Sequence, residues 1–143
     1  MNKDKFIECG ILIAANELEV EPIDYAIDYR GILKENDISG LYDPLKNLIV
    51  INSDWINEAS NNDILQVVFH EMRHFYQKKQ IDFLRKGLDI NEEKIRILKW
   101  ENEFSIYVKP NQSNRKLYAD QTIEKDAFEF SKSLLNKVLS LIS

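Results

Sequence analysis

The chain has only two histidines, and they stand four residues apart, at His70 and His74. With Glu71 they form the pattern H-E-x-x-H. Residues i and i+4 of a helix project from one face, so both imidazoles can bind one zinc ion about 2.0–2.1 Å from their nitrogens. Glu71 lies at the side of the same metal, where it can accept a proton from a zinc-bound water whose pKa is near ~7. The pattern predicts hydrolysis, because the resulting hydroxide attacks a carbonyl and the carboxylate returns the proton to the leaving amine.

A zinc site with two histidines needs a third protein ligand and an open position for water. The chain has no third histidine, so the candidates are carboxylates that follow the motif. Glu124 is favoured because it falls near the start of the expected last helix, on the side that faces the core. A carboxylate there is costly unless a partner such as a metal binds it. Asp120, Glu101 and Glu103 remain as alternatives.

Further polar residues are expected to support the site. A tetrahedral intermediate needs a hydrogen-bond donor for its oxyanion, and Tyr118 is the favoured donor, followed by Tyr107. The alternative for Tyr118 is a partly buried tyrosine with a satisfied hydroxyl. Asp126 is a candidate to orient one histidine ring, and Arg73 is expected to point away from the metal toward a carboxylate on another helix. Gln77 either supports the second histidine or lies on the helix surface.

The elements that must position these residues follow from apolar spacing and turn signals. The region 23–52 reads as a small, mostly antiparallel sheet with a hairpin around Pro44, and its best strand is the apolar run 48–52. The other expected strands are 25–29 and 38–42. The expected helices are 3–18, a long one from 61 to 80 or 87, 91–103, and a last one from 120 or 122 to 141, with a polar loop at 109–116.

The helix that carries the motif has a wide apolar stripe, which indicates burial between layers. Ile95, Leu98 and Trp100 are expected to pack the helix over 91–103. On the last helix Phe128 is expected to face the core, on the same side as Glu124. The elements together predict a single α+β domain over residues 1–143, with an N-terminal helix, a small sheet, a buried active-site helix and C-terminal helices.

Composition excludes several classes of protein. A length of 143 residues suits one domain, and no apolar run approaches the roughly 18–20 residues that span a bilayer. The first residues lack the apolar stretch of about 7–15 residues typical of a secretory signal, and Cys9 is the only cysteine, so a cytoplasmic protein is expected. A net charge of −5 argues against nucleic-acid binding, which needs a clustered basic surface.

The motif region also resembles a known family. The stretch HEMRHFYQ from His70 to Gln77 is followed after about 50 residues by the pattern E-x-D-A-x-x-F from Glu124 to Phe130. Over residues 38–135 the chain looks like the small zincin-type metallopeptidases of bacteria, their phages and mobile elements, and it is similar to the ImmA/IrrE group. The resemblance implies a zincin-like fold, with both motif histidines and Glu124 as zinc ligands and Glu71 as the general base.

These observations predict a zinc-dependent metallopeptidase that binds one Zn²⁺ ion and hydrolyses peptide bonds through a zinc-bound water activated by Glu71. Its expected partner is a protein or peptide substrate, with no nucleic acid and no membrane. The substrate's identity, the cleavage specificity and the oligomeric state stay open. The alternative is a catalytically inactive zinc-binding protein whose site holds the fold together while its surface binds a partner. A hydrolase that acts on a non-peptide amide would use the same zinc hydroxide chemistry.

Overall fold

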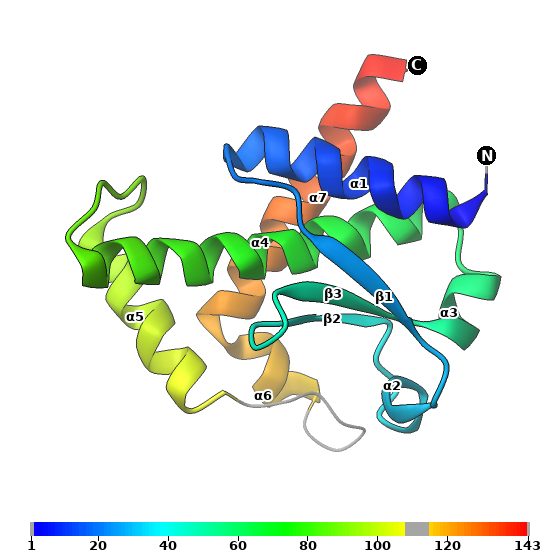
Figure 1. Ribbon diagram of the computed structural model, residues 1–143, viewed down its shortest axis with the longest axis horizontal. Coiled ribbons are helices and arrows are strands. Elements are labelled where there is room, and N and C mark those ends of the chain that lie inside the picture. Colours follow the sequence, from blue (N-terminus) through cyan, green and yellow to red (C-terminus); the bar gives the residue numbers. More distant parts are fainter. Residues whose placement is uncertain (1, 108–114, 143) are drawn as a thin grey trace.

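The computed structural model describes residues 2–107 and 115–142. Figure 1 shows the long helix α4 running through the middle of the molecule, with α1 along one side, the sheet on the other, and α7 crossing it. The expected loop at 109–116 lies outside the described residues except for its last two, which begin α6. The elements in chain order are α1 (Lys3–Leu18), β1 (Asp24–Asp28), α2 (Ile32–Glu35), β2 (Gly40–Asp43), β3 (Leu48–Asn52), α3 (Ser53–Glu58), α4 (Asn61–Lys86), α5 (Lys94–Ser105), α6 (Arg115–Asp120) and α7 (Thr122–Ile142).

The three strands form a mixed sheet in the order β1-β3-β2. β2 and β3 are antiparallel, as the hairpin around Pro44 predicts, and Tyr42 pairs with Ile49. The prediction of a mostly antiparallel sheet is wrong for the other half, because β1 runs parallel to β3 and pairs Ala26 with Val50. Between β1 and β2 the chain passes through α2, and in the sheet β3 lies between these two strands. The direction of β1 is therefore not set by a tight turn, as it is for the β2–β3 hairpin.

Helix α4 is fixed at both ends by its own caps. The Ser60 hydroxyl accepts a hydrogen bond from the Asp63 backbone N–H at 3.1 Å. Gly87 ends the helix in the left-handed conformation with φ of 71°, which glycine adopts without a steric penalty. The helix therefore continues through Lys86, the longer of the two expected lengths.

Helix α1 packs closely on α4 because Gly10 has no side chain. A Cβ built there would lie 3.0 Å from the nearest Val68 methyl and 3.3 Å from a Leu65 methyl. The contact leads into one apolar cluster to which α1, the sheet, α3, α4, α5 and α7 all contribute. Its largest fully buried apolar side chains include Trp100, Phe69, Ile7, Ile49, Ile51, Ile64 and Met72.

On two helices, some residues that are expected to face the core are exposed instead. On α5, Ile95 is 80% exposed and Leu98 is 37% exposed, whereas Ile97 is fully buried. The helix begins at Lys94 instead of 91, and its buried face consists of Ile97 and of Trp100, the second of which the sequence predicts. On α7, Phe128 is 53% exposed, whereas Ala127, Ser131 and Leu134 on the same helix are buried.

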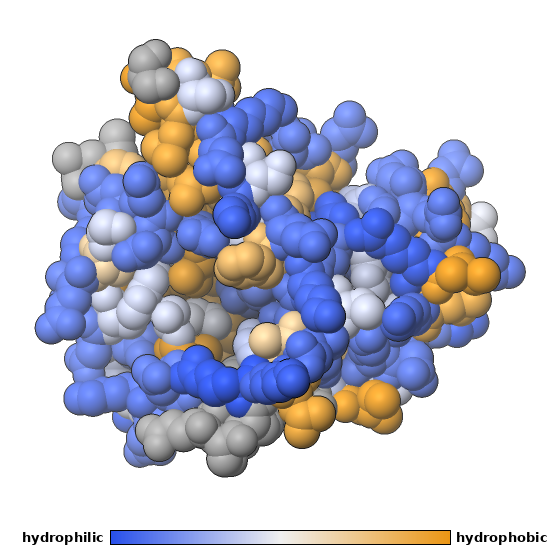
Figure 2. Space-filling view, turned by 180° about the vertical axis from the view of Figure 1, so that it is seen from behind, coloured by the Kyte–Doolittle hydropathy of each residue, from blue (hydrophilic) through white to orange (hydrophobic). Residues whose placement is uncertain are grey.

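The last turn of α7 extends beyond the core. Leu141 and Ile142 are 77% and 76% exposed, and Figure 2 shows apolar groups gathered on this projecting end, above a mainly hydrophilic face. Among the helices of the described residues, none combines the length and the apolarity that a bilayer span requires.

Candidate metal centre

The structure brings His70, His74 and Glu124 together. The two histidines lie one turn apart on α4, with their ring centroids 4.9 Å apart. Glu124, in the first turn of α7, places Oε1 2.9 Å from His70 Nε2 and Oε2 3.0 Å from His74 Nε2. One potential ligand atom from each of the three residues lies within 4.8 Å of the others. These are the three residues that the sequence predicts as ligands.

The donor set fits a zinc ion. Zinc takes imidazole nitrogen and carboxylate oxygen in tetrahedral geometry, and bonds of about 2.0–2.1 Å put neighbouring ligand atoms roughly 3.3 Å apart. The nitrogen–oxygen distances of 2.9 and 3.0 Å therefore need to lengthen by only a few tenths of an ångström. With three protein ligands a zinc ion would keep a fourth position for water, and the His70 side chain on this cluster is 17% exposed.

The charges of the three residues are coupled. Burial on its own would raise the pKa of Glu124, but His74 and His70 lower that pKa well below the ordinary value, so the side chain is a carboxylate. Burial would lower the pKa of His74, but the Glu124 carboxylate raises it to about 9. A divalent cation that binds these groups would displace the imidazole protons, since only neutral imidazole coordinates a metal.

Glu71 lies beside the three candidate ligands. It is 7% exposed, and its carboxylate accepts a hydrogen bond from the Tyr42 backbone N–H in β2. Burial raises the pKa of Glu71 above its ordinary value. A buried carboxyl group with a raised pKa, next to a candidate metal site, has the properties expected of a general base.

A cleft of about 260 Å³ opens onto these residues. His70 and Glu71 line it, together with Gly40 at the start of β2, Tyr118 of α6 and Phe128 of α7. The cleft explains why Phe128 is exposed on the side of α7 that the sequence assigns to the core: this part of the helix face borders the cleft.

The two tyrosines considered as oxyanion donors have different positions. Tyr107 donates a hydrogen bond to Glu124 Oε2 at 2.8 Å, so it holds a candidate ligand. Tyr118 lines the cleft beside Glu71, also hydrogen-bonds to Glu124, and packs edge-on against Tyr107 with the ring centroids 6.3 Å apart. Burial raises the pKa of both phenols above the ordinary value, so both remain donors at neutral pH. The role of Tyr118 stays a prediction.

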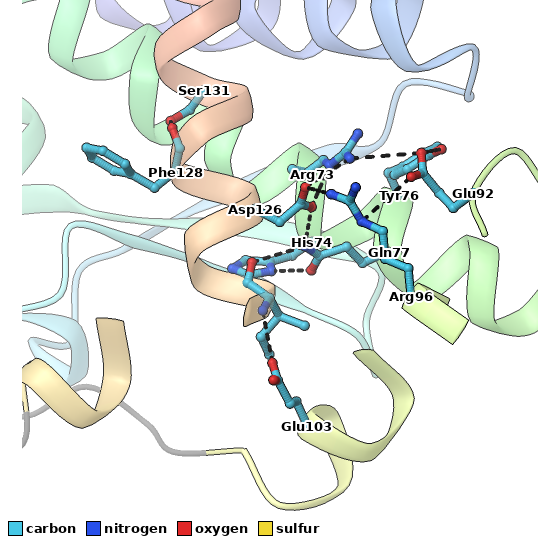
Figure 3. Close-up of polar contacts among 11 residues, drawn as sticks. Arg73, His74, Tyr76, Gln77, Glu92, Arg96, Glu103, Asp126, Phe128 and Ser131 are labelled. Atoms are coloured by element: carbon cyan, nitrogen blue, oxygen red, sulfur yellow. Dashed lines mark hydrogen bonds and ion pairs between the residues drawn. The ribbon is translucent and has the colours of Figure 1, made fainter. Parts of the chain in front are cut away.

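The supporting residues lie behind His74, in the interface of α4 and α7 (Figure 3). Arg73 makes two hydrogen bonds to Asp126, at 2.8 and 3.1 Å, which confirms the expected pairing across the helix interface. Asp126, the candidate to orient a histidine ring, reaches His74 through Gln77: it accepts a hydrogen bond from the Gln77 amide at 2.8 Å, and that amide contacts the His74 ring. Gln77 is fully buried, and its Oε1 lies 2.9 Å from His74 Nδ1, so it is not a surface residue.

The alternative third ligands have other places in the fold. Glu101 forms an ion pair with Arg85 near the end of α4, and Asp120 is exposed at the end of α6. Glu103 binds the start of α7: Oε1 accepts from the Ile123 backbone N–H at 2.9 Å, and Oε2 accepts from the Thr122 hydroxyl at 2.7 Å. None of the three belongs to the metal-ligand cluster found among the described residues.

The Glu103→Ala variant should lower the free energy of unfolding by about 0.5–2 kcal/mol, because the first turn of α7 loses its cap. Zinc should still bind at one ion per chain, since the ligands stay in place. Denaturant unfolding and elemental analysis measure the two quantities. Glu101→Ala is the matched control and should destabilise less, because its partner Arg85 is exposed. A Glu103→Ala protein that had lost its zinc would make Glu103 a ligand instead.

No protein-family model matches the chain, and neither a curated protein nor a solved structure matches it significantly. Function is therefore inferred from the chemistry of the site.

Proposed function

We propose that the protein is a zinc-dependent metallopeptidase that binds one Zn²⁺ ion and hydrolyses peptide bonds. The observation that carries the proposal is the position of the Glu124 carboxylate, 2.9 and 3.0 Å from the Nε2 atoms of His70 and His74. Glu71 of the same motif lies beside them in a cleft. Two imidazoles, a carboxylate ligand, a separate buried carboxyl group and an open side form the constellation that zinc hydrolysis requires.

Each residue has a defined role in this proposal. His70, His74 and Glu124 hold the zinc ion, which when bound lowers the pKa of a coordinated water and polarises the substrate carbonyl. Glu71 accepts the proton of the attacking water and then donates it to the leaving amine. The Tyr118 hydroxyl, in the cleft wall, would leave its hydrogen bond to Glu124 and donate one to the oxyanion that develops on the substrate.

The cleft favours a peptide as the substrate. It extends from His70 and Glu71 to Gly40, the first residue of β2, which is an edge strand. Edge strands carry backbone groups that can pair with an extended peptide. Val67 and Phe128 give the cleft an apolar wall against which a substrate side chain can pack. The proposed substrate is therefore an extended segment of a peptide or protein.

Two measurements on the purified protein test the proposal. Elemental analysis should find about one zinc ion per chain, and mass spectrometry should detect cleavage within a mixture of synthetic peptides. A chelator should stop the cleavage and added zinc should restore it. Absence of bound zinc, or cleavage that survives full removal of metal, would contradict the proposal.

A zinc-binding protein without catalytic activity is the second candidate. It is favoured by one observation: the candidate ligands come from two helices, α4 and α7, so a metal ion would cross-link them. Removal of zinc should then lower the melting temperature. At a free zinc concentration 1,000-fold above Kd the ion stabilises by about 4 kcal/mol, which is roughly 10–15 °C for a chain of this length. A shift of this size without cleavage of any peptide would favour this second candidate over the peptidase.

A further inference from the structure

Gln77 occupies a polar position inside the interface of α4 and α7, and its side chain is fully buried. Its amide makes three hydrogen bonds. Oε1 lies 2.9 Å from His74 Nδ1, while Nε2 donates to the Ile123 carbonyl at 3.0 Å and to Asp126 Oδ2 at 2.8 Å. Figure 3 shows Gln77 between the His74 ring and Asp126. The amide thus joins one candidate ligand to the helix that carries another.

These contacts determine which way the amide points. The Ile123 carbonyl and the Asp126 carboxylate have no proton to donate, so both must face the NH₂ end of Gln77. The amide oxygen is then left facing His74, and an amide oxygen only accepts hydrogen bonds. His74 Nδ1 must therefore carry the proton. A flipped amide would set its oxygen against two acceptors in a buried site, which is strongly unfavourable.

Asp126 is itself held in place. Arg73 binds both of its carboxylate oxygens, at 2.8 and 3.1 Å, and Arg96 also forms an ion pair with it. The Arg73 guanidinium lies over the rings of Tyr76 and Phe130, 4.6 and 5.1 Å from their centroids. A carboxylate bound on both oxygens by two arginines keeps a fixed orientation, so the acceptor that faces Gln77 keeps its place.

We propose that Gln77 is a positioning residue that keeps the proton of His74 on Nδ1 and so leaves Nε2 as the metal-binding atom. Asp126 and the Ile123 carbonyl keep Gln77 in the orientation that this requires. Because Ile123 directly precedes Glu124, the same amide also sets the distance between two of the three ligands. The inference rests on the proposed zinc site and concerns how this chain prepares its ligands for the ion.

Zinc affinity is the first test. Gln77→Met keeps the size of the side chain but removes both the acceptor and the donors. It should weaken zinc binding about 10–100-fold, the cost typical of losing a group that orients a metal ligand. Affinity is measured by competition with a chromophoric chelator.

Gln80 on the same helix offers a matched control. Its side chain is 2% exposed, and its Oε1 accepts from the Asn91 backbone N–H at 2.7 Å, away from the ligands. Gln80→Met should lose stability and keep its zinc affinity. An unchanged affinity in Gln77→Met, or an equal loss in both variants, would overturn the role of Gln77.

A second test uses the unmodified protein and does not depend on a variant that folds. With only two histidines in the chain, ¹⁵N-histidine labelling gives a spectrum of two imidazoles. In the zinc-loaded protein, His74 should show a proton on Nδ1 that exchanges slowly with solvent, and Nε2 should have the shift of a metal-bound nitrogen. Zinc bound through Nδ1, or a rapidly exchanging Nδ1 proton, would overturn the inference while the proposed function stands. A protein that binds no zinc would instead contradict the proposed function.

Discussion

The Glu71→Gln variant is expected to lower kcat on a cleavable peptide by about 10²–10⁴-fold while one zinc ion per chain remains bound. Glutamine has the shape of glutamate and keeps an oxygen that can accept from the Tyr42 N–H, but it does not take up a proton at neutral pH. Glu71 is also absent from the ligand cluster, so the metal should not be lost. Initial rates and zinc content, measured on the same preparation, test both halves of this prediction.

Glu129→Gln is the control for this variant. Glu129 is exposed on α7, so its replacement changes the net charge by the same amount without touching the site. It should cleave at the rate of the unmodified protein. If Glu71→Gln cleaved as fast as this control, Glu71 would not be the general base. If it lost zinc, Glu71 would have to be counted among the groups that hold the ion.

Local signals in the sequence predict most elements of the fold but not the direction of every strand. The caps Ser60 and Gly87 mark the ends of α4 because their chemistry acts within a few residues. The turn around Pro44 likewise sets β2 antiparallel to β3. The direction of β1 depends on how the chain crosses the sheet through α2, and the sequence around Gly31 contains no signal for that path.

Residues of the candidate site were predictable where helical spacing, or the free-energy cost of burying a charged side chain, determines where a side chain lies. His70 and His74 share a helix face by geometry, and the buried position of Glu124 follows from helical periodicity. The contact of Gln77 with the Ile123 carbonyl was not predictable, because every residue carries a backbone carbonyl and the sequence does not indicate which one a side chain will contact. The predicted burial of Phe128 was wrong for a related reason. An apolar residue that borders a cleft has the same helical spacing as one that faces the core.

The Glu124→Gln variant is expected to weaken zinc binding by more than about 100-fold, which exceeds the cost of losing a group that only orients a ligand. Glutamine keeps an oxygen that accepts the hydrogen bond from Tyr107, so the fold around the site should be retained. It removes the negative charge that lies 2.9 and 3.0 Å from the two imidazoles. A site with two neutral imidazoles and an amide holds a divalent cation poorly, and peptide cleavage should be lost with the metal.

Thermal unfolding with and without chelator separates this outcome from simple destabilisation. The melting temperature of the unmodified protein should fall when zinc is removed, whereas that of Glu124→Gln should not respond, because no bound ion is left to remove. Asp120→Asn is the control, since Asp120 is an exposed carboxylate at the end of α6, just before the helix that carries Glu124. It should respond to chelator as the unmodified protein does. A chelator response in Glu124→Gln equal to that of Asp120→Asn would remove Glu124 from the ligands, and the ion would then need another carboxylate, because the chain has no third histidine to supply.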